Sequence, residues 1–208
     1  MNLFNTSLKA AVLGCCAFLF GLQSWGQCGL TIESSPAVLP EAGTVYRFYI
    51  EADDPTDKLS AIFGNDQMPL AISCPGGIYN NAFNSSWNAS GINPALVPVF
   101  PDLADDSFAT IGLDGPAAGV PGAEDPSLVQ DASLPVTVSG FFQDLTGTVT
   151  DLNVNTLTGA SWYVLNTAAN ALPTNGRWLV AQVTTTGDLS GTLNAQIFPL
   201  GVGADQHS

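Results

Sequence analysis

The sequence predicts an all-β fold, an antiparallel β-sandwich that follows an N-terminal signal peptide. Turn-forming residues are abundant, with 21 Gly and 14 Pro among 208 residues, and they lack the G-X-Y period of collagen. Roughly eight to ten short β-rich runs follow one another, with no helical stripe longer than two turns between them. Strands without crossover helices favour a sandwich, and an up-and-down barrel is the alternative.

The first half of the chain gives three strand predictions. Residues 44–50 are rich in aromatic and β-branched side chains that alternate between two faces. The polar segment 51–57 contains Pro55, which ends the ladder. Residues 59–63 and 70–73 form two short strands around a Gly-Asn-Asp turn.

The second half continues the pattern. Residues 177–186 and 192–198 flank a Gly-rich turn and predict a closing hairpin. Residues 168–172 suit one helical turn. The other predicted strands are 108–113, 134–142, 146–154 and 160–165.

Two long segments do not resemble strands and are predicted to be loops. Residues 75–101 hold Gly, Asn, Ser and several Pro, and residues 114–131 hold Gly, Pro and acids. Loops of this length are often functional. Asn84 and Asn88 in the first loop match the N-glycosylation sequon, which matters only in a eukaryotic host.

The N-terminus has the features of a signal peptide. Lys9 supplies a positive charge, residues 10–22 are apolar or small, and Ser24 and Gly26 suit cleavage before Gln27. The alternative is a membrane anchor, although the apolar run is short for a bilayer. We therefore expect residues 1–26 to be removed, and residues 27–208 to form one secreted, extracellular domain with no membrane contact.

The charge balance excludes several partners. Four Lys and Arg oppose eighteen Asp and Glu, for a net charge of −14. Nucleic acids and anionic membranes both require a basic surface. After signal removal the only bases are Arg47, Lys58 and Arg177.

The cysteines suggest one disulfide. Cys15 and Cys16 leave with the signal, so Cys28 and Cys74 remain as a pair in an exported chain. The alternative is two separate thiols.

Enzymatic motifs are scarce. The single His, His207, is the penultimate residue, which argues against Ser-His-Asp catalysis and His-based zinc sites. Glu51 and Asp53 resemble the acid-x-acid motif of some β-sandwich glycosidases, but Pro55 interrupts the strand. We expect no enzyme, and a paired-carboxylate glycoside hydrolase is the second alternative.

Two acidic clusters are candidate calcium sites. At most three of the eighteen acids can meet a base, so the others must be hydrated or bind cations. The alternative is a generally acidic surface that keeps a secreted protein soluble. The candidate Ca²⁺ ligands are Asp53, Asp54 and Asp57 in one cluster, and Asp102, Asp105 and Asp106 in the other.

Aromatic residues are candidates for sugar contact. Trp162 and Trp178 lie within predicted strands and are expected in the core. Tyr79, Phe83 and Trp87 lie in the first long loop, where they could stack on carbohydrate. The alternative is that they fasten this loop to the body of the protein.

Several segments resemble uncharacterised modules of large secreted bacterial surface proteins. These segments are residues 47–64, 106–113, 161–165 and 184–198. At the level of fold, the order of strands is similar to cohesin-like and carbohydrate-binding sandwiches. The resemblance implies no activity and no site residues, because function does not follow from fold.

These observations together predict a secreted, non-enzymatic β-sandwich. We expect it to act in extracellular binding, adhesion or matrix and surface structure, with extracellular polysaccharide or other surface proteins as partners. A carbohydrate-binding module is the alternative.

Overall fold

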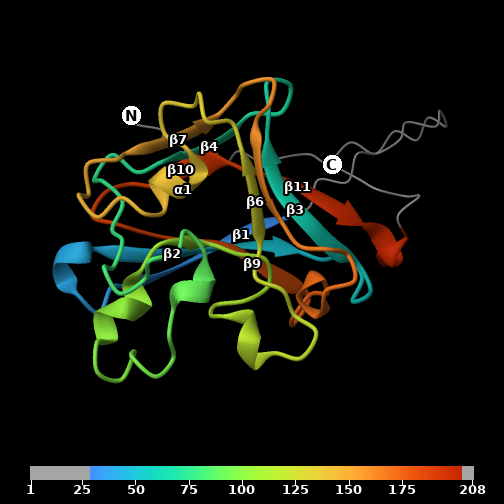
Figure 1. The fold of residues 1–208 in the computed structure, drawn as a ribbon, viewed down its shortest axis with the longest axis horizontal. Coiled ribbons are helices and arrows are strands. Elements are labelled where there is room, and N and C mark those ends of the chain that lie inside the picture. The colour runs from blue at the N-terminus through green and yellow to red at the C-terminus, as the bar shows by residue number, and fades with distance from the viewer. Residues whose placement is uncertain (1–28, 203–208) are drawn as a thin grey trace, which may run out of the picture.

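The computed structural model describes residues 29–202, which form an all-β fold of three antiparallel sheets (Figure 1). Sheet A has the order β1 (Leu30–Pro36), β2 (Thr44–Glu51), β9 (Arg177–Thr185), β5 (Phe108–Ala109). Sheet B has the order β11 (Asn194–Phe198), β3 (Lys58–Gly64), β8 (Ala160–Tyr163), β6 (Ser127–Gln130). Sheet C has the order β10 (Ser190–Thr192), β4 (Leu70–Ser73), β7 (Asp151–Val154).

The main core lies between sheet A and the other two sheets. Sheet A contributes Phe48 and Trp178, sheet B contributes Trp162, and sheet C contributes Ile72 and Leu152. Both tryptophans are fully buried, which confirms their predicted place in the core. The sheets keep open edges, so the chain forms the predicted sandwich and not the closed alternative.

Helical structure is confined to short turns among the described residues. The one α-helix is α1 (Val138–Phe141), which begins where the Thr137 hydroxyl accepts a hydrogen bond from the Gly140 amide at 3.1 Å. No helix within residues 29–202 is long and apolar enough to cross a membrane. The 3₁₀ turns are η1 (Pro40–Ala42), η2 (Ala89–Gly91), η3 (Pro101–Asp105), η4 (Ala117–Gly119), η5 (Ala169–Ala171) and η6 (Pro199–Gly201).

The alternating segments were predicted well. Strands β2, β3, β4, β8 and β9 match their expected positions closely. The predicted strand 134–142 is wrong, because the Thr137 cap turns this segment into α1. Strand β5 is shorter than predicted, and the predicted strand 146–154 is reduced to β7. Strands β1 and β6 were missed; neither buries a single residue fully, so their hydrophobic alternation is weak.

The predicted closing hairpin is also wrong. Strand β9 pairs with β2 and β5, whereas β10 pairs with β4 and β11 pairs with β3. Gly191 lets β10 approach β4 closely, since a Cβ at this position would collide with the carbonyl oxygen of Ala71. The last three strands therefore enter three different sheets.

A register shift in β9 decides which of its side chains lie on the outer face of sheet A, the face directed away from sheets B and C. The pairing of β9 with β2 skips one residue between Ala181 and Leu179. Trp178 and Val180 point into the main core, whereas Leu179 and Gln182 contact groups on the outer face. A β-bulge of this kind re-aims the side chains that follow it.

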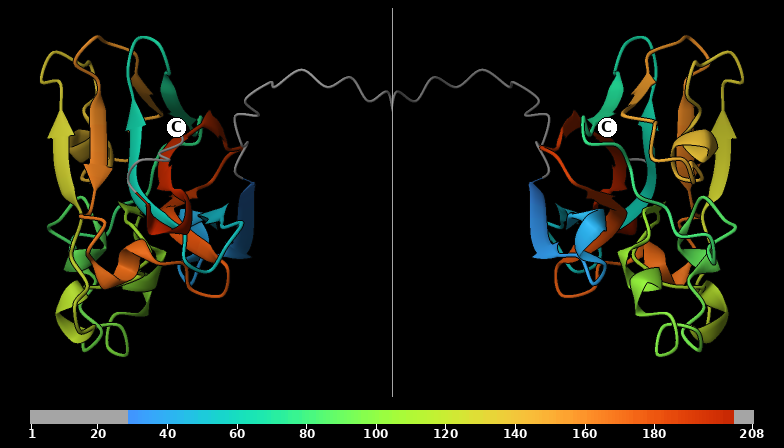
Figure 2. Two further views of the ribbon diagram at one scale, coloured as in Figure 1. Left: turned by 90° about the vertical axis from the view of Figure 1, so that its right-hand side faces the viewer. Right: turned by 90° about the vertical axis from the view of Figure 1, so that its left-hand side faces the viewer.

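An outer layer formed by residues 89–125, apart from strand β5 within them, covers the outer face of sheet A. Figures 1 and 2 show this layer in green and yellow-green, on the side of sheet A away from sheets B and C. A second, smaller core joins the layer to the sheet and consists of Ala89, Ile92, Leu103, Phe108 and Leu179. The layer and the outer face together frame the candidate site.

The predicted signal peptide, residues 1–26, lies outside the described residues, as do Cys28 and the C-terminal residues 203–208.

Candidate functional site

Three surface hollows meet at Arg47 on the outer face of sheet A. We name them the apolar hollow (380 Å³), the edge hollow (320 Å³) and the arginine hollow (300 Å³), and together the Arg47 groove. The apolar hollow lies under the outer layer and is lined mainly by Ile92, Pro94, Val97, Pro98, Leu103 and Phe108. The edge hollow runs along β1 beside Glu33, Ser35 and Val38, and the arginine hollow extends toward Arg177.

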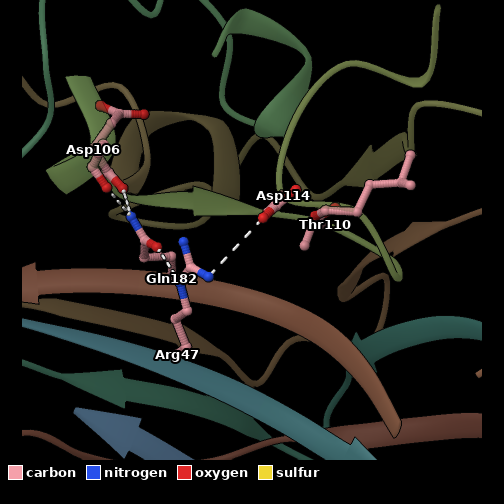
Figure 3. Close-up of polar contacts among 7 residues, drawn as sticks. Arg47, Asp106, Thr110, Asp114 and Gln182 are labelled. Atoms are coloured by element: carbon pink, nitrogen blue, oxygen red, sulfur yellow. Dashed lines mark hydrogen bonds and ion pairs between the residues drawn. The ribbon is translucent and has the colours of Figure 1, made fainter. Parts of the chain in front are cut away.

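Gln182 holds the guanidinium of Arg47 in place. The Nε–H of Arg47 donates to Oε1 of Gln182 at 2.8 Å, and the two side chains face each other across β2 and β9 (Figure 3). The Gln182 amide in turn donates to the carbonyl oxygens of Ala104 and Asp106, at 2.9 and 2.6 Å. Because Gln182 is fully buried and has all its amide groups engaged, it fixes one side of Arg47 and leaves the terminal nitrogens directed toward the groove.

Asp114 is the acidic neighbour of Arg47. One of its carboxylate oxygens lies 4.0 Å from an Arg47 terminal nitrogen, and 72% of the Asp114 side chain is exposed. The Thr110 hydroxyl donates to the Leu113 carbonyl at 2.7 Å and fixes the turn that carries Asp114 (Figure 3). An exposed ion pair at this distance contributes little stability, so its partner exchanges readily.

Arg177 lies at the far end of the arginine hollow. Its guanidinium carbon stacks over the Tyr49 ring, 3.8 Å from the centroid, and one terminal nitrogen contacts Glu33 at 2.7 Å. The Glu33 contact raises the pKa of Arg177, which keeps the guanidinium charged. The charged and aromatic groups that bound the hollow are therefore two guanidinium groups, the Asp114 carboxylate and the Tyr49 ring.

The second acidic cluster consists of Asp102, Asp105 and Asp106. Its carboxylates bind separate protein donors and do not point toward one shared position. The two carboxylate oxygens of Asp105 accept from the amides of Val38 and Leu39, both at 2.8 Å. Asp102 accepts from the Asn81 side chain at 2.8 Å. These carboxylates hold protein donors rather than an open cation site.

Asp106 is the most deeply buried acid among residues 29–202. It accepts from the Asn81 amide and from the Asn84 side chain, and it is 1% exposed. Burial raises its pKa to about 7, against the opposing effect of these hydrogen bonds. Its carbonyl oxygen accepts from Gln182, so Asp106 is linked directly to the residue that holds Arg47.

The first acidic cluster closes a turn. Asp57 accepts from the amides of Asp54 and Leu200, at 2.9 and 2.8 Å, and Asp54 accepts from Thr56. Asp53 is exposed. Within residues 29–202, no group of three or more Asp, Glu, His or Cys side chains is arranged to hold a metal ion. Neither predicted calcium site therefore enters the functional site.

The three loop aromatics have separate surroundings. Trp87 is half-buried and packs against the main core, and the Tyr79 hydroxyl accepts from the Asn81 side chain at 3.3 Å. Phe83 is 49% exposed and stacks on Phe100 with ring centroids 4.2 Å apart. Trp87 thus fastens the loop, and Phe83 is the member of the set most available to a ligand.

Both sequons lie in a buried network. The Asn84 side-chain nitrogen donates to Asp106 at 2.7 Å and to the Asn88 carbonyl at 3.3 Å. The Asn88 side-chain nitrogen donates to the Pro126 carbonyl at 3.2 Å. A glycan would replace one of the two hydrogens on either nitrogen and would need space that these buried side chains lack, so both asparagines serve the fold.

The predicted disulfide involves one described residue. Cys74 is fully buried in the main core, and burial raises its thiol pKa to about 11, with a further contribution from Asp151. Its predicted partner, Cys28, lies outside the described residues. The Cys28–Cys74 bond stays a prediction.

Sequence reasoning did not identify the Arg47 groove. Arg47 and Arg177 stood out only as two of the chain's four basic residues. That scarcity was the available signal, because a protein with so few bases exposes positive charge at very few places. No family model, curated protein or solved structure matches this chain.

Proposed function

We propose that this protein is a secreted, non-enzymatic β-sandwich that binds an extracellular partner in the Arg47 groove. The proposal joins the expected export and the resemblance to surface-protein modules with the geometry of the groove. The partner is an extracellular polysaccharide or another surface protein. The protein thus acts in adhesion or in the structure of a matrix or surface layer.

The observation that carries the proposal is the meeting of three hollows at one fixed guanidinium. Gln182 holds Arg47 from below and is itself held by two backbone carbonyls. A side chain fixed before binding loses little conformational entropy when a ligand arrives. An apolar wall on one side and polar walls on the other suit a ligand with two kinds of surface.

The carbohydrate-binding alternative has its own observation. Phe83 is half-exposed and its ring is held by Phe100, which suits stacking against a sugar ring. A module of this kind would bind through Phe83 and not through Arg47.

Binding measurements on variants test the proposal. The folded protein is immobilised and exposed to extracellular polysaccharides and surface-protein fractions, and binding is followed by interferometry. We expect Arg47→Gln to weaken the observed binding tenfold or more. Lys58→Gln removes the same charge outside the groove and is expected to bind normally.

The Phe83→Ala variant separates the two candidate functions. Binding that survives Arg47→Gln but disappears in Phe83→Ala would assign the function to the aromatic pair. Binding that survives both changes would overturn the groove as the site.

A further inference from the structure

We infer that the arginine hollow binds the carboxylate of an acidic sugar, so that the ligand is a polysaccharide containing uronic acid. This inference rests on the proposed function and names the chemistry of its ligand. It follows from the charge, the free donors, the neighbouring acid and the polar rim of the hollow.

Charge is the first step. Two of the chain's four basic residues, Arg47 and Arg177, line one hollow of 300 Å³. Asp114 lies beside Arg47 and Glu33 beside Arg177, well within the Debye length of about 8 Å at physiological salt, so these acids offset part of the positive charge. What the hollow offers an anion is therefore two neighbouring guanidinium groups whose N–H donors are only partly used, on a protein with very few other bases.

Donor capacity is the second step. A guanidinium carries five N–H groups in a planar fork that matches the two oxygens of a carboxylate. Among the described residues, the only hydrogen bond that Arg47 donates goes from Nε to Gln182, which leaves its terminal nitrogens for a ligand. Arg177 uses one terminal nitrogen on Glu33.

The Asp114 carboxylate shows where a ligand carboxylate could approach Arg47. Its carboxylate approaches Arg47 within the lining of the same hollow, but at 4.0 Å it lies beyond hydrogen-bond distance. A carboxylate free to adopt bidentate geometry makes shorter, charge-assisted bonds to the same nitrogens. The ligand would thus replace a loose internal partner with a tighter one.

The rim of the hollow suits sugar hydroxyls. Thr174 and Asn175 are exposed, and each offers both a donor and an acceptor. They lie on a tight turn in which Asn175 and Gly176 have φ values of 55° and 78°, closed by two backbone bonds between Thr174 and Arg177. Such a two-residue turn holds the rim rigidly.

The position of the hollow favours a sugar over an extended peptide. Strand β2 lies between β1 and β9, and β9 lies between β2 and β5. Their backbone groups beneath the hollow are already paired, so a peptide could not add here as a further strand. A ligand on this face must be recognised by side chains, as a charged and hydroxylated ring is.

The test uses short oligogalacturonides and the same oligosaccharides after reduction of their carboxyl groups. Binding is measured by calorimetry at physiological ionic strength. We expect the acidic oligosaccharides to bind and the reduced ones to bind at least tenfold more weakly. Arg47→Gln and Arg177→Gln should each weaken binding at least tenfold, with Lys58→Gln as the matched control.

The outcomes separate the two proposals. Equal binding of reduced and acidic oligosaccharides, or no binding of the acidic ones, overturns the inference about the carboxylate. An acidic peptide that binds and loses affinity in Arg177→Gln, while the uronates do not bind, also overturns it but supports the groove. Uronate binding that is unaffected by Arg47→Gln and Arg177→Gln overturns both. Thermal unfolding of each variant checks that the fold is intact.

Discussion

At the scale of single residues, Gln182 connects the fold to the candidate site. It is buried on a central strand and bonds to the Arg47 side chain and to two carbonyls of the outer layer. A buried polar side chain costs the fold least when its groups are all hydrogen-bonded, as the amide groups of Gln182 are. The same three bonds that stabilise the fold also orient the guanidinium.

Replacing Gln182 with Leu should destabilise the protein by about 2–4 kcal/mol, because buried groups lose their partners. The free energy of unfolding in urea measures the loss. Gln143→Leu is the matched control, since Gln143 donates a single exposed bond to the Ser85 carbonyl. A change within error of that control would show that the Gln182 bonds contribute no net stability.

Asp106 should make stability depend on pH. Its folded pKa of about 7 lies above the unfolded value of 3.8, so the folded state binds the proton more tightly. Its contribution to stability is therefore present below about pH 4 and is lost as the pH rises through 7, by an amount on the order of 4 kcal/mol.

Unfolding of Asp106→Asn across this pH range tests the assignment. The variant should lack this part of the pH dependence, whatever its absolute stability. Asp66→Asn removes one charge from an exposed turn and should keep the wild-type slope. An unchanged slope in Asp106→Asn would show that another group is responsible.

At the scale of elements, strand prediction succeeded where one face of a strand is buried. Residues 44–50 and 160–165 alternate because one face of each strand packs into the main core and the other does not. Edge strands β1 and β6 were missed because their exposed residues are free to be polar or apolar. Helix α1 was missed because a single cap residue decided the conformation of an apolar segment.

The candidate site could not be predicted for a different reason. Arg47 and Arg177 are 130 residues apart, and they meet through the pairing of β2 with β9. Simple alternation would have placed Gln182 on the same face as Trp178, and only the register shift turns it toward Arg47. Which strands pair, and where a bulge shifts their register, depends on residues far apart in the chain, so local patterns in a single sequence do not predict either.

The outer layer should open more easily than the sheets. Its own core has five buried residues, whereas the main core joins all three sheets. Hydrogen exchange should show residues 92–103 exchanging by local opening and β9 only by global unfolding. Leu103→Ala should speed exchange in the layer more than in β9, because Leu103 is fully buried there. Uniform acceleration across both regions would contradict this independence.

At the scale of the whole molecule, the net charge of −14 opposes compactness. Sodium chloride should therefore raise the melting temperature by screening repulsion between acids. Calcium at matched ionic strength should raise it no further, because the described residues contain no cluster fit for a metal ion. Calorimetric scans in both salts measure the difference, and a calcium-specific increase would reveal a site.

The existence of two separate cores has a consequence for engineering. Residues 89–125 shape the apolar hollow, yet they rest on sheet A through a small core of their own. Substitutions at Val97 or Pro98 would therefore alter the wall that a ligand meets while leaving the framework of three sheets intact. The chain has the division between constant scaffold and adjustable surface that library design requires, and Arg47 supplies the fixed point around which new specificities could be selected.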